Sequence, residues 1–439
     1  MFRSSTLFVS LAVFCSSVYA QALGPDAATP KVLSKIVVVG DSISAGVENF
    51  SLLDSQQPHG YASVIAQQAG VSLPLPLVPY PGVPNVLQLK SLNPLTIVNA
   101  DPGVTPNPPR DSQCTQPTTL SIPGVTLEQA MTVTPTSSYP PLASNPLGPV
   151  ANWADIVLGY PSPLAAQTCG VSPVSQTEVQ QAVALKPSAI IEWLGNNDAL
   201  VPALIGVLSD LTPIPTFINE YETLLNTLKQ TGAPIVTATV PDVTKAPYFT
   251  PVSVIARKTN SSPQAVAAKL GIGPNDLLRE TAVPIAMSIL AGHEAPAGWP
   301  TTCPAPNLDL PVPSVPCVLT ASDAVYVQGT IDAYNAIIFS ESLLHGAAVV
   351  DTHALVDSWA QNGYNADGKH LTLGFLGGLI SLDGIHPTNT GYAIMANTFI
   401  NVINAAWGVH IPQADVNAVA AHDPLFKYAD QPYTYPPVQ

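Results

Sequence analysis

Two short motifs at opposite ends of the chain carry residue types that act together in nucleophilic catalysis. Near the start, an apolar run at residues 36–39 breaks into G-D-S at residues 40–42, and near the end stands D-G-I-H-P at residues 383–387. A serine at the tip of a buried strand is a candidate nucleophile. A D-x-x-H loop can bring it a base and the carboxylate that orients the base. The motifs therefore predict a triad of Ser42, His386 and Asp383.

The chemistry explains why these residue types are needed. A serine hydroxyl is a poor nucleophile at neutral pH, so a neighbouring base must take its proton during attack. Histidine is suited to this because its ordinary pKa lies near neutrality. Asp383 would fix the tautomer of His386 and stabilise the imidazolium. The tetrahedral oxyanion needs fixed hydrogen-bond donors, whose removal typically costs ~3–4 kcal/mol each.

The middle of the chain offers such donors. Gly124 follows a short extended run at residues 118–122, and its backbone N–H can approach a ligand closely because no Cβ intervenes. A third apolar run at residues 189–194 ends in G-N-N-D, which places side-chain amides at its end. Asn196 and Asn197 are both candidates there. Asp198 is predicted to be structural, and Asp41 to satisfy local backbone donors.

These residues resemble the GDSL-type, or SGNH, hydrolase superfamily, named for a nucleophilic Ser, an oxyanion Gly, an oxyanion Asn and a catalytic His. Ser42 matches the first block, which here reads G-D-S-I rather than G-D-S-L, and Gly124 matches the second. Asn197 matches the asparagine of the G-x-N-D block, with Asn196 in its variable position. Asp383 and His386 match the final D-x-x-H-P block. All four blocks occur in the order that the family shows.

The resemblance implies a three-layer α/β/α, flavodoxin-like domain with a five-stranded parallel sheet in the order 2-1-3-4-5. The sequence supports this independently, because near-continuous Val/Ile runs alternate with helical patterns. In such sheets, ligands lie beyond the carboxyl ends of the strands, where Ser42, Gly124 and Asn197 are expected. The expected strands are residues 35–39, 118–122, 189–194, 235–240 and 347–350.

Helices are expected between and after these strands. The predicted helices are residues 61–69, a helix starting near Thr126, and residues 217–230, 263–270, 322–344 and 390–407. Ser262 should cap the helix that begins at Pro263.

Two long Pro-rich insertions are expected, at about residues 71–117 and 241–321. Residues 71–110 carry ten prolines and no clear period, so they are predicted to be one long excursion. We expect both insertions to form walls or a lid over the cleft. The apolar residues 375–380 either line an acyl pocket or pack in the core.

The predicted hydrolase domain covers residues 21–412. Residues 1–20 read as a secretory signal, with a charged start, a short apolar stretch and a small-residue cleavage site. Residues 413–439 read as a tail without an assignable role. The signal indicates a secreted or periplasmic protein.

Four cysteines remain after the signal, and an even number in an exported protein favours two disulfides. Three pairings are possible. We favour Cys303–Cys317, which closes a Pro-rich loop, together with Cys114–Cys169. A metal site is the weaker reading, because no C-x-x-C pair or histidine cluster accompanies them.

Composition excludes several classes. The net charge of −15 argues against nucleic acid or anionic lipid as a partner. The 46 % hydrophobic content can build a sizeable core, which argues against disorder. No segment after the signal is apolar for long enough to cross a membrane.

A second D-x-x-H spacing competes with the first. Asp367 and His370 repeat it, but they lie in a polar stretch and lack the following proline. His386 is followed by Pro387 and a strong helix start, which would hold its loop still, so it is the preferred base.

The sequence thus predicts a secreted serine ester hydrolase of carboxylesterase or lipase type, working without metal or organic cofactor. The oxyanion hole would be the Ser42 N–H, the Gly124 N–H and the Asn197 amide. A carbohydrate O-deacetylase of the same fold, acting on acylated polysaccharide, is the alternative. A non-catalytic exported binding protein that keeps the fold is a rival from another class.

Overall fold

A parallel sheet forms the centre of the protein. The computed structural model describes residues 31–104, 110, 114–135, 149–159, 169, 175–305, 313–429 and 431–435. The expected signal at residues 1–20 lies outside this part of the chain. The sheet has four strands in the order β1 (Ile36–Gly40), β4 (Ala189–Trp193), β5 (Ile235–Ala238) and β11 (Ala348–Val350), all parallel.

The fifth expected strand, at residues 118–122, is not a regular strand. It runs parallel to β1 through a single bridge between Val38 and Thr119, with hydrogen bonds from Val38 N to Thr118 O (2.8 Å) and from Ile122 N to Gly40 O (3.0 Å). Prolines at both ends of the segment have no N–H to extend a ladder. The expectation of five strands was therefore wrong by one, but the segment lies where the order 2-1-3-4-5 requires its second member.

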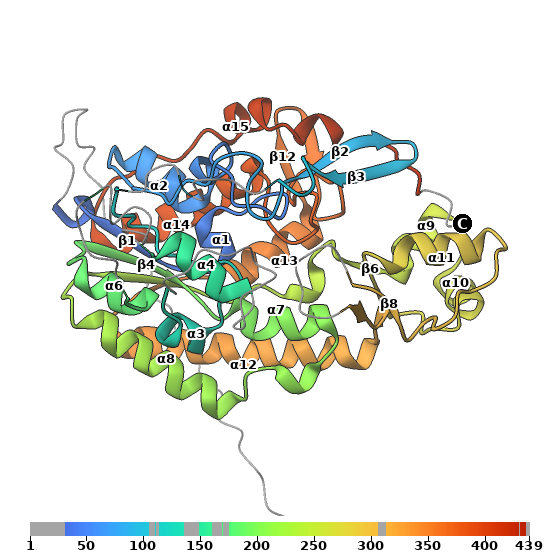
Figure 1. Cartoon of the computed structure of the whole chain (residues 1–439), viewed down its shortest axis with the longest axis horizontal. Coiled ribbons are helices and arrows are strands. Elements are labelled where there is room, and N and C mark those ends of the chain that lie inside the picture. Colours follow the sequence, from blue (N-terminus) through green and yellow to red (C-terminus); the bar gives the residue numbers. More distant parts are fainter. Residues whose placement is uncertain are drawn as a thin grey trace, which may run out of the picture.

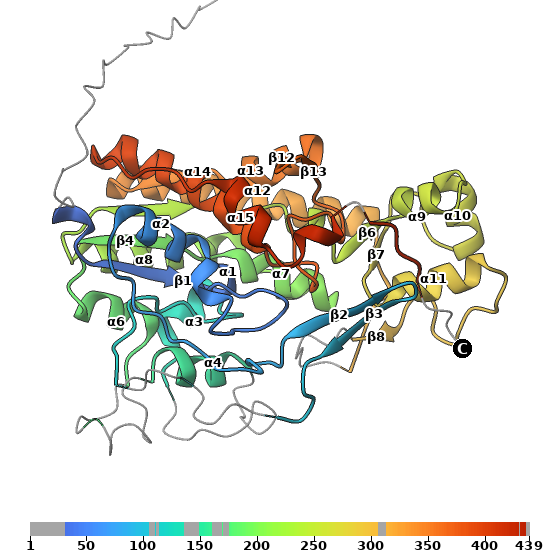
Figure 2. The ribbon, with the colours of Figure 1, turned by 90° about the horizontal axis from the view of Figure 1, so that it is seen from above.

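Helices cover both faces of the sheet. This is expected because successive side chains of β1 point to opposite faces and are buried on both. Val37 and Val39 face one buried cluster, whereas Ile36 and Val38 face another. The first face is covered by α3 (Leu127–Thr132), α6 (Glu178–Ala184), α8 (Ile214–Lys229) and α12 (Ala321–His345). The second is covered by α2 (Tyr61–Ala69), α13 (Thr352–Asn362), α14 (Asn389–Trp407) and α15 (Val416–His422) (Figures 1 and 2). The three-layer α/β/α architecture is confirmed.

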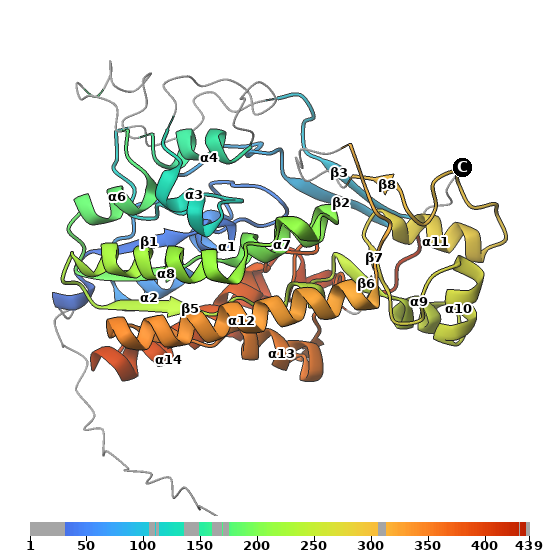
Figure 3. The same ribbon diagram turned by 90° about the horizontal axis from the view of Figure 1, so that it is seen from below.

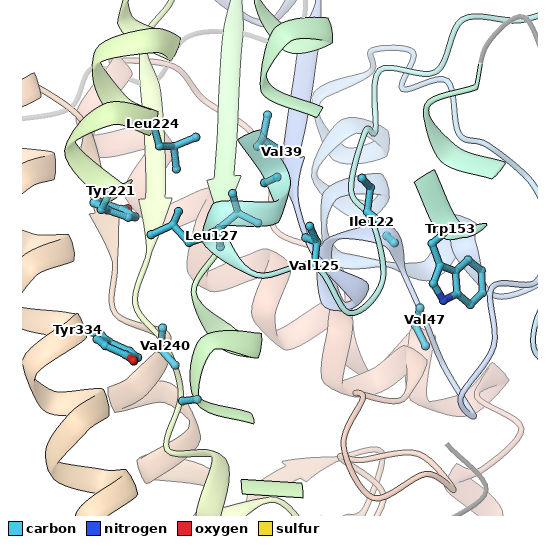
Figure 4. Packing of buried hydrophobic residues seen from close by; sticks show 14 of the residues in the cluster. Val39, Val47, Ile122, Val125, Leu127, Trp153, Tyr221, Leu224, Val240 and Tyr334 are labelled. Carbon is cyan, nitrogen blue, oxygen red and sulfur yellow. The ribbon is translucent and has the colours of Figure 1, made fainter. Parts of the chain in front are cut away.

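The first cluster is rich in aromatic contacts. Phe217 of α8 stacks on Tyr334 of α12 with 4.0 Å between ring centroids, which joins the two long helices that lie side by side in Figure 3. Figure 4 shows Val39 and Leu127 in the same layer, with Tyr221 and Leu224 beside them. This packing fixes the helices against the strand that carries the candidate nucleophile.

Residues 71–110 contain regular structure that the sequence analysis did not anticipate. Strands β2 (Leu87–Leu92) and β3 (Leu95–Asn99) form an antiparallel hairpin that reaches away from the sheet (Figures 1 and 2). At its turn, Thr434 N donates to Leu92 O (3.0 Å) and Leu95 N donates to Thr434 O (2.6 Å). The described end of the chain therefore extends the hairpin.

Residues 241–321, called the side lobe below, have a hydrophobic cluster of their own at one end of the molecule (Figure 1). An antiparallel sheet orders β10 (Val318–Leu319), β7 (Leu277–Arg279) and β6 (Phe249–Pro251). Helices α9 (Val252–Lys258), α10 (Pro263–Leu270) and α11 (Ala282–Leu290) pack with it. The predicted cap of α10 is confirmed, since Ala265 N donates to Ser262 Oγ at 3.1 Å.

Both favoured disulfides are present. Cys303–Cys317 lies within the side lobe with 4.9 Å between Cα atoms, and Cys114–Cys169 has 5.5 Å. The first ties the two ends of a loop whose middle lies outside the described residues.

The remaining elements are short or peripheral. They are α1 (Ser42–Ala45), α4 (Pro149–Val157), α7 (Asn196–Ile205), β8 (Cys303–Pro304), β9 (Ser314–Val315), β12 (Tyr364–Ala366), β13 (Lys369–Leu371) and the 3₁₀ turns Lys31–Leu33, Gln57–His59, Leu208–Asp210, Val243–Lys245 and Phe426–Tyr428. Part of the expected C-terminal tail belongs to the core, because Val416, Ala420 and Phe426 are buried in the second cluster. Within the described parts of the chain, no helix is both long and apolar enough to span a membrane.

Candidate active site

The candidate nucleophile lies at the carboxyl edge of the sheet. Ser42 is the first residue of α1, directly after β1, and is 8 % exposed. Asp41 caps this helix, with Ile43 N donating to its Oδ1 at 3.0 Å. The turn is tight, since a Cβ at Gly40 would lie 2.3 Å from Ser44 Oγ and 2.9 Å from Trp193 O. Glycine at position 40 is therefore required for the chain to pass from strand to helix here.

The candidate base and its carboxylate form a hydrogen-bonded pair. His386 Nδ1 and Asp383 Oδ2 are 2.9 Å apart. Asp383 Oδ1 accepts from the backbone N–H groups of Ile385 and His386, both at 2.8 Å. Burial acts to raise the pKa of Asp383, but the charge and hydrogen bonds of His386 prevail and hold the pKa below its usual range. A carboxylate that stays ionised can orient an imidazole and stabilise its protonated form.

A turn after α1 completes the surroundings of Asp383. Phe50 N donates to Asp383 Oδ2 at 2.6 Å. The turn closes with reciprocal backbone hydrogen bonds between Glu48 and Ser51, and its central residues Asn49 and Phe50 have φ values of +52° and +58°. This left-handed conformation is rare for a phenylalanine. It aims a backbone donor at Asp383 Oδ2, the same oxygen that is paired with His386 Nδ1.

Asn49 links the segment that follows Ser42 to the loop that carries His386. Asn49 N donates to Ser381 Oγ (3.0 Å), and Leu382 N donates to Asn49 Oδ1 (3.1 Å). Close by, Tyr392 OH donates to Val47 O at 2.6 Å. The segment that follows Ser42 and the loop that carries His386 are thus held at one rim of the sheet. Sequence reasoning missed this contact.

His386 Nε2 faces the interior without a partner. The atom is buried and makes no hydrogen bond with any described residue, so Ser42 and His386 are not hydrogen-bonded in this structure. They nevertheless lie at the same rim. Burial raises the pKa of Asp41 to about 6, and the charge on His386 is one of the influences that lower it.

The candidate oxyanion donors converge on the same place. Gly124 has a φ of +78° in a turn closed by Val125 N donating to Ile122 O. Asn197, in the first turn of α7, donates through Nδ2 to Val125 O at 2.9 Å. Asn197 Nδ2 also lies 3.5 Å from Asp41 Oδ2. Ser42, Gly124 and Asn197 are therefore brought together around Asp41.

Two neighbours of these donors have structural partners. Asn196 Nδ2 donates to Asp41 Oδ2 at 2.8 Å, so Asp41 both caps α1 and links it to the start of α7. Asp198 accepts from Leu127 N (3.0 Å) and Thr212 Oγ1 (2.7 Å), so it ties α7 to α3. Within the described chain, the N–H groups of Ser42 and Gly124 have no acceptor.

The competing histidine lies elsewhere. His370 is an exposed residue of β13, and its Nδ1 is 2.9 Å from Asn365 Oδ1 across the β12–β13 hairpin. Asp367 sits in the turn of that hairpin with a φ of +43°. The carboxylate at this second D-x-x-H spacing therefore occupies a tight turn, and the imidazole pairs with a neutral amide.

The side lobe directly contacts the loop that carries Asp383 and His386. Tyr248 N donates to Gly384 O at 3.0 Å. Gly384 has a φ of +71°, and a Cβ there would lie 2.8 Å from Tyr248 N, so only glycine allows this approach. The loop between Asp383 and His386 is held by the side lobe on one side and by the Asn49 turn on the other.

Both expected insertions line one cavity beside this contact. The cavity has a volume of about 240 Å³ and includes Ile97 of the hairpin, Pro247 and Glu280 of the side lobe, Phe375, and Tyr435 near the end of the chain. Leu379 and Ile380, in contrast, are buried in the core. The apolar stretch at residues 375–380 thus packs partly in the core and partly along a cavity, and its role as an acyl pocket stays a prediction.

A larger cleft adjoins this cavity. It has a volume of about 760 Å³ and shares Pro247, Thr250, Phe375 and Tyr435 with the first. Among the described residues, no group of three or more His, Cys, Asp or Glu side chains is arranged to hold a metal ion.

Comparison with known proteins adds little. No family model matches the sequence, and no curated protein does so either. One similar solved structure is LAE5, an alpha/beta hydrolase enzyme from the metagenome of Lake Arreo, Spain, with 14 % identity, 85 % of this chain and 95 % of that chain covered, and a TM-score of 0.35. Another is the lipase/acylhydrolase from Enterococcus faecalis, with 11 % identity, 87 % and 100 % covered, and a TM-score of 0.33. Likeness at these scores carries no argument about function, which must come from the site itself.

Proposed function

We propose that this protein is an exported serine ester hydrolase that works through an acyl-enzyme on Ser42. The observation that carries the proposal is the Asp383–His386 pair, whose outer nitrogen, Nε2, is buried and without a partner at the rim where Ser42 begins its helix. A base held by an ionised carboxylate, with its free nitrogen near a serine, is the arrangement that activates a hydroxyl for attack.

The proposed reaction has two halves. His386 Nε2 takes the proton of Ser42 as Oγ attacks the ester carbonyl, and the C–O bond to the alcohol then breaks as His386 returns the proton to the leaving oxygen. Water, deprotonated by His386, next attacks the acyl-enzyme. The acid leaves and Ser42 regains its proton. The proposed reaction requires Ser42 Oγ to come within hydrogen-bond distance of His386 Nε2.

The proposed oxyanion hole consists of the Ser42 N–H, the Gly124 N–H and the Asn197 side chain. The two backbone groups have no acceptor among the described residues, which is what a preorganised donor requires. Asn197 has one amide hydrogen on Val125 O, and its other one is only loosely engaged by Asp41 at 3.5 Å. That second hydrogen is the one available for an oxyanion.

A carboxylesterase or lipase substrate is favoured by the apolar lining of the smaller cavity, to which Ile97, Phe375 and Tyr435 contribute. The alternative substrate, an acylated carbohydrate, is favoured by the larger cleft, where Asn275, Gln328 and Asn362 lie with aromatic residues. Initial rates on acetyl, butyryl and long-chain aryl esters, measured beside acetylated oligosaccharides, separate the two.

Export is supported by the two disulfides, because disulfides persist mainly in oxidising compartments. Together with the signal-like residues 1–20, they favour a secreted or periplasmic location. Identification of the mature N-terminus after expression with the native leader would test this.

The decisive experiment is Ser42→Ala with p-nitrophenyl acetate as substrate. We expect kcat to fall by at least about a thousandfold, since removing a triad member typically costs that much or more. His386→Ala should do the same, whereas His370→Ala, the matched control on the exposed hairpin, should keep most activity. Retained turnover in Ser42→Ala would refute the assignment. A serine-directed phosphonate that fails to label the wild type would instead support the non-catalytic binding protein.

A further inference from the structure

The smaller cavity combines apolar walls with one carboxyl group. Of its ten lining residues, Glu280 is the only acidic one, and none is lysine, arginine or histidine. Phe375 and Tyr435 supply aromatic rings, and Val283, Pro284, Leu95 and Ile97 supply aliphatic surface. The lining comes from the hairpin, the side lobe, the segment before the catalytic loop and the chain end. The cavity therefore exists only because the peripheral segments meet there.

The carboxyl group of Glu280 has no hydrogen-bond or ion-pair partner within the described chain. Its side chain is half-buried. Burial, together with the smaller effect of the negative charge of Asp383, raises the pKa of Glu280 to about 8. A half-buried carboxyl group without a partner in the protein can pair with a ligand that enters the cavity.

The cavity lies beside the reacting groups. Pro247 lines it, and the next residue, Tyr248, donates its backbone N–H to Gly384 O in the catalytic loop. The influence of Asp383 on Glu280 is a second sign of proximity. The cavity therefore adjoins the loop that carries His386, and it can receive a part of the substrate that extends away from Ser42.

The chemistry of the lining separates three kinds of ligand. A hydrocarbon chain would leave Glu280 without a partner, and an anion would be repelled by both Glu280 and Asp383. An alkylammonium group satisfies both components, since a carboxylate attracts its charge and aromatic faces bind it through their quadrupoles. Of the rings that line this cavity, Tyr435 already faces a cation, although the closer contact of that cation is with Tyr433, which does not line the cavity. Lys258 Nζ lies 3.6 Å from the ring centroid of Tyr433 and 5.5 Å from that of Tyr435.

Resting on the proposed esterase function, we propose that the cavity formed by Glu280, Phe375 and Tyr435 binds an alkylammonium group of the substrate, so that the enzyme prefers esters with a cationic alcohol or acyl part. Glu280 acts as the residue that determines specificity for charge. The chain end acts as part of the binding site, because it supplies Tyr435.

The test compares two ligands of the same shape and different charge. Choline and 3,3-dimethyl-1-butanol differ only in a quaternary nitrogen in place of a quaternary carbon. We expect the wild-type protein to bind choline about tenfold more tightly at pH ~8.5, measured by calorimetry, which is the usual size of one charge or cation–π contact. Choline should also raise the KM for p-nitrophenyl butyrate without lowering kcat.

Glu280→Gln should remove this preference, whereas Glu294→Gln, on an exposed position of the same side lobe, should leave it intact. A measurement on the wild type makes the test independent of how Glu280→Gln folds. Asp383 stays ionised and the neighbouring Tyr248 and Tyr435, whose pKa values are raised, stay neutral between pH ~6.5 and ~8.5. Affinity for choline should therefore rise across this range as Glu280 ionises, while affinity for the neutral alcohol should not.

Equal binding of the two ligands by the wild type would overturn the inference, as would a choline affinity that does not change with pH. Neither ligand is an ester, so the outcome does not depend on turnover. If the protein hydrolyses esters without preferring the cation, this inference is wrong and the proposed function stands. If it binds the cation but hydrolyses no ester, the proposed function is wrong and only the cation site remains.

Discussion

Asp383 is the most fully engaged residue of the candidate site. It accepts hydrogen bonds from the backbone N–H groups of Phe50, Ile385 and His386 in addition to the bond with the His386 ring. These donors stabilise the ionised form and leave the carboxylate little freedom to rotate. The orientation of the His386 ring is therefore fixed by backbone groups from both ends of the chain.

Asn49 offers a test of that arrangement. Asn49→Ala removes the acceptor of Leu382 N and places a residue with a Cβ at a φ of +52°, so we expect the free energy of unfolding to fall by roughly 2–4 kcal/mol. We also expect kcat on an aryl ester to fall about tenfold with little change in KM, because a displaced Asp383 affects the chemical step. Urea unfolding and steady-state kinetics check both.

Asn49→Gly is the matched control, since glycine adopts the left-handed conformation without strain but lacks the side-chain acceptor. It should unfold at a higher urea concentration than Asn49→Ala and share its loss in kcat. If both variants turn over substrate like the wild type, the turn does not position Asp383.

The sequence predicted chemistry-bearing side chains better than the backbone groups that hold them. Asp383 and His386 could be paired from their spacing, whereas position after a strand left both Asn196 and Asn197 open, and only the G-x-N-D resemblance favoured Asn197. The donation from Phe50 N to Asp383 has no sequence signal, because any residue except proline carries that donor. Asn49 gave only the weak hint that asparagine tolerates positive φ.

At the scale of elements, the catalytic loop is held by the start of α14. Thr388 caps this helix by accepting from Gly391 N at 3.1 Å, and its hydroxyl donates to Gly378 O at 2.9 Å. Ser381 N donates to His386 O at 2.8 Å, which closes the loop on itself. The helix start that follows Pro387 in the sequence is thus the anchor that the motif predicted.

Gly384→Ala tests the contact between this loop and the side lobe. The new Cβ would have to move away from Tyr248 N, 2.8 Å distant, and the residue would also keep an unfavourable φ. We expect the free energy of unfolding to fall by more than the ~1–2 kcal/mol that positive φ alone costs, and activity to fall as His386 shifts. Thermal unfolding and kcat on p-nitrophenyl acetate measure the two effects.

The second D-x-x-H loop supplies the control. Gly368 has a φ of +76° and nothing within 4 Å of its imagined Cβ, so Gly368→Ala carries the conformational penalty alone. It should lose stability modestly and keep its activity. Equal losses in the two variants would show that the approach of Tyr248 to Gly384 is not needed.

The elements that the sequence predicted are those with a clear period or a cap. The ends of α2 and α10 agree with the expected residues 61–69 and 263–270, because apolar spacing and capping residues marked them. The β2–β3 hairpin was missed, since its residues are only half-buried and surrounded by prolines that indicate loops. Helix α15 was missed because its apolar face is too short to indicate a helix in the sequence, and the helix is stabilised by packing on α14.

At the scale of the whole molecule, buried carboxyl groups gather beneath the candidate nucleophile. Glu178 accepts from Gly40 N, and Glu192 lies fully buried in the neighbouring strand β4. Burial raises the pKa of Glu178 well above its ordinary value and that of Glu192 to about 8. In a chain with a net charge of −15, these groups make stability depend on pH in a definite direction.

Glu192→Gln tests this direction. The folded protein keeps a proton on Glu192 between pH 4.5, its ordinary pKa, and about 8, whereas the unfolded chain loses it. The native state therefore binds more protons, and the free energy of unfolding contributed by Glu192 falls as pH rises through this window. Glutamine imitates the protonated acid, since it can still accept from Leu194 N and exchange a hydrogen bond with Tyr221 OH.

Wild type and Glu192→Gln should consequently unfold at similar urea concentrations near pH ~5, and the variant should become the more stable one as pH rises, by up to about 1.4 kcal/mol for each pH unit. Urea titrations at several pH values with disulfides intact measure the gap, and Glu222→Gln, exposed on α8, is the control. A gap that stays constant with pH would mean that Glu192 is ionised in the fold. The carboxyl cluster would then bear negative charge beside Val39 and Gly40, the residues that lead into Ser42, so this measurement also bears on the proposed reaction.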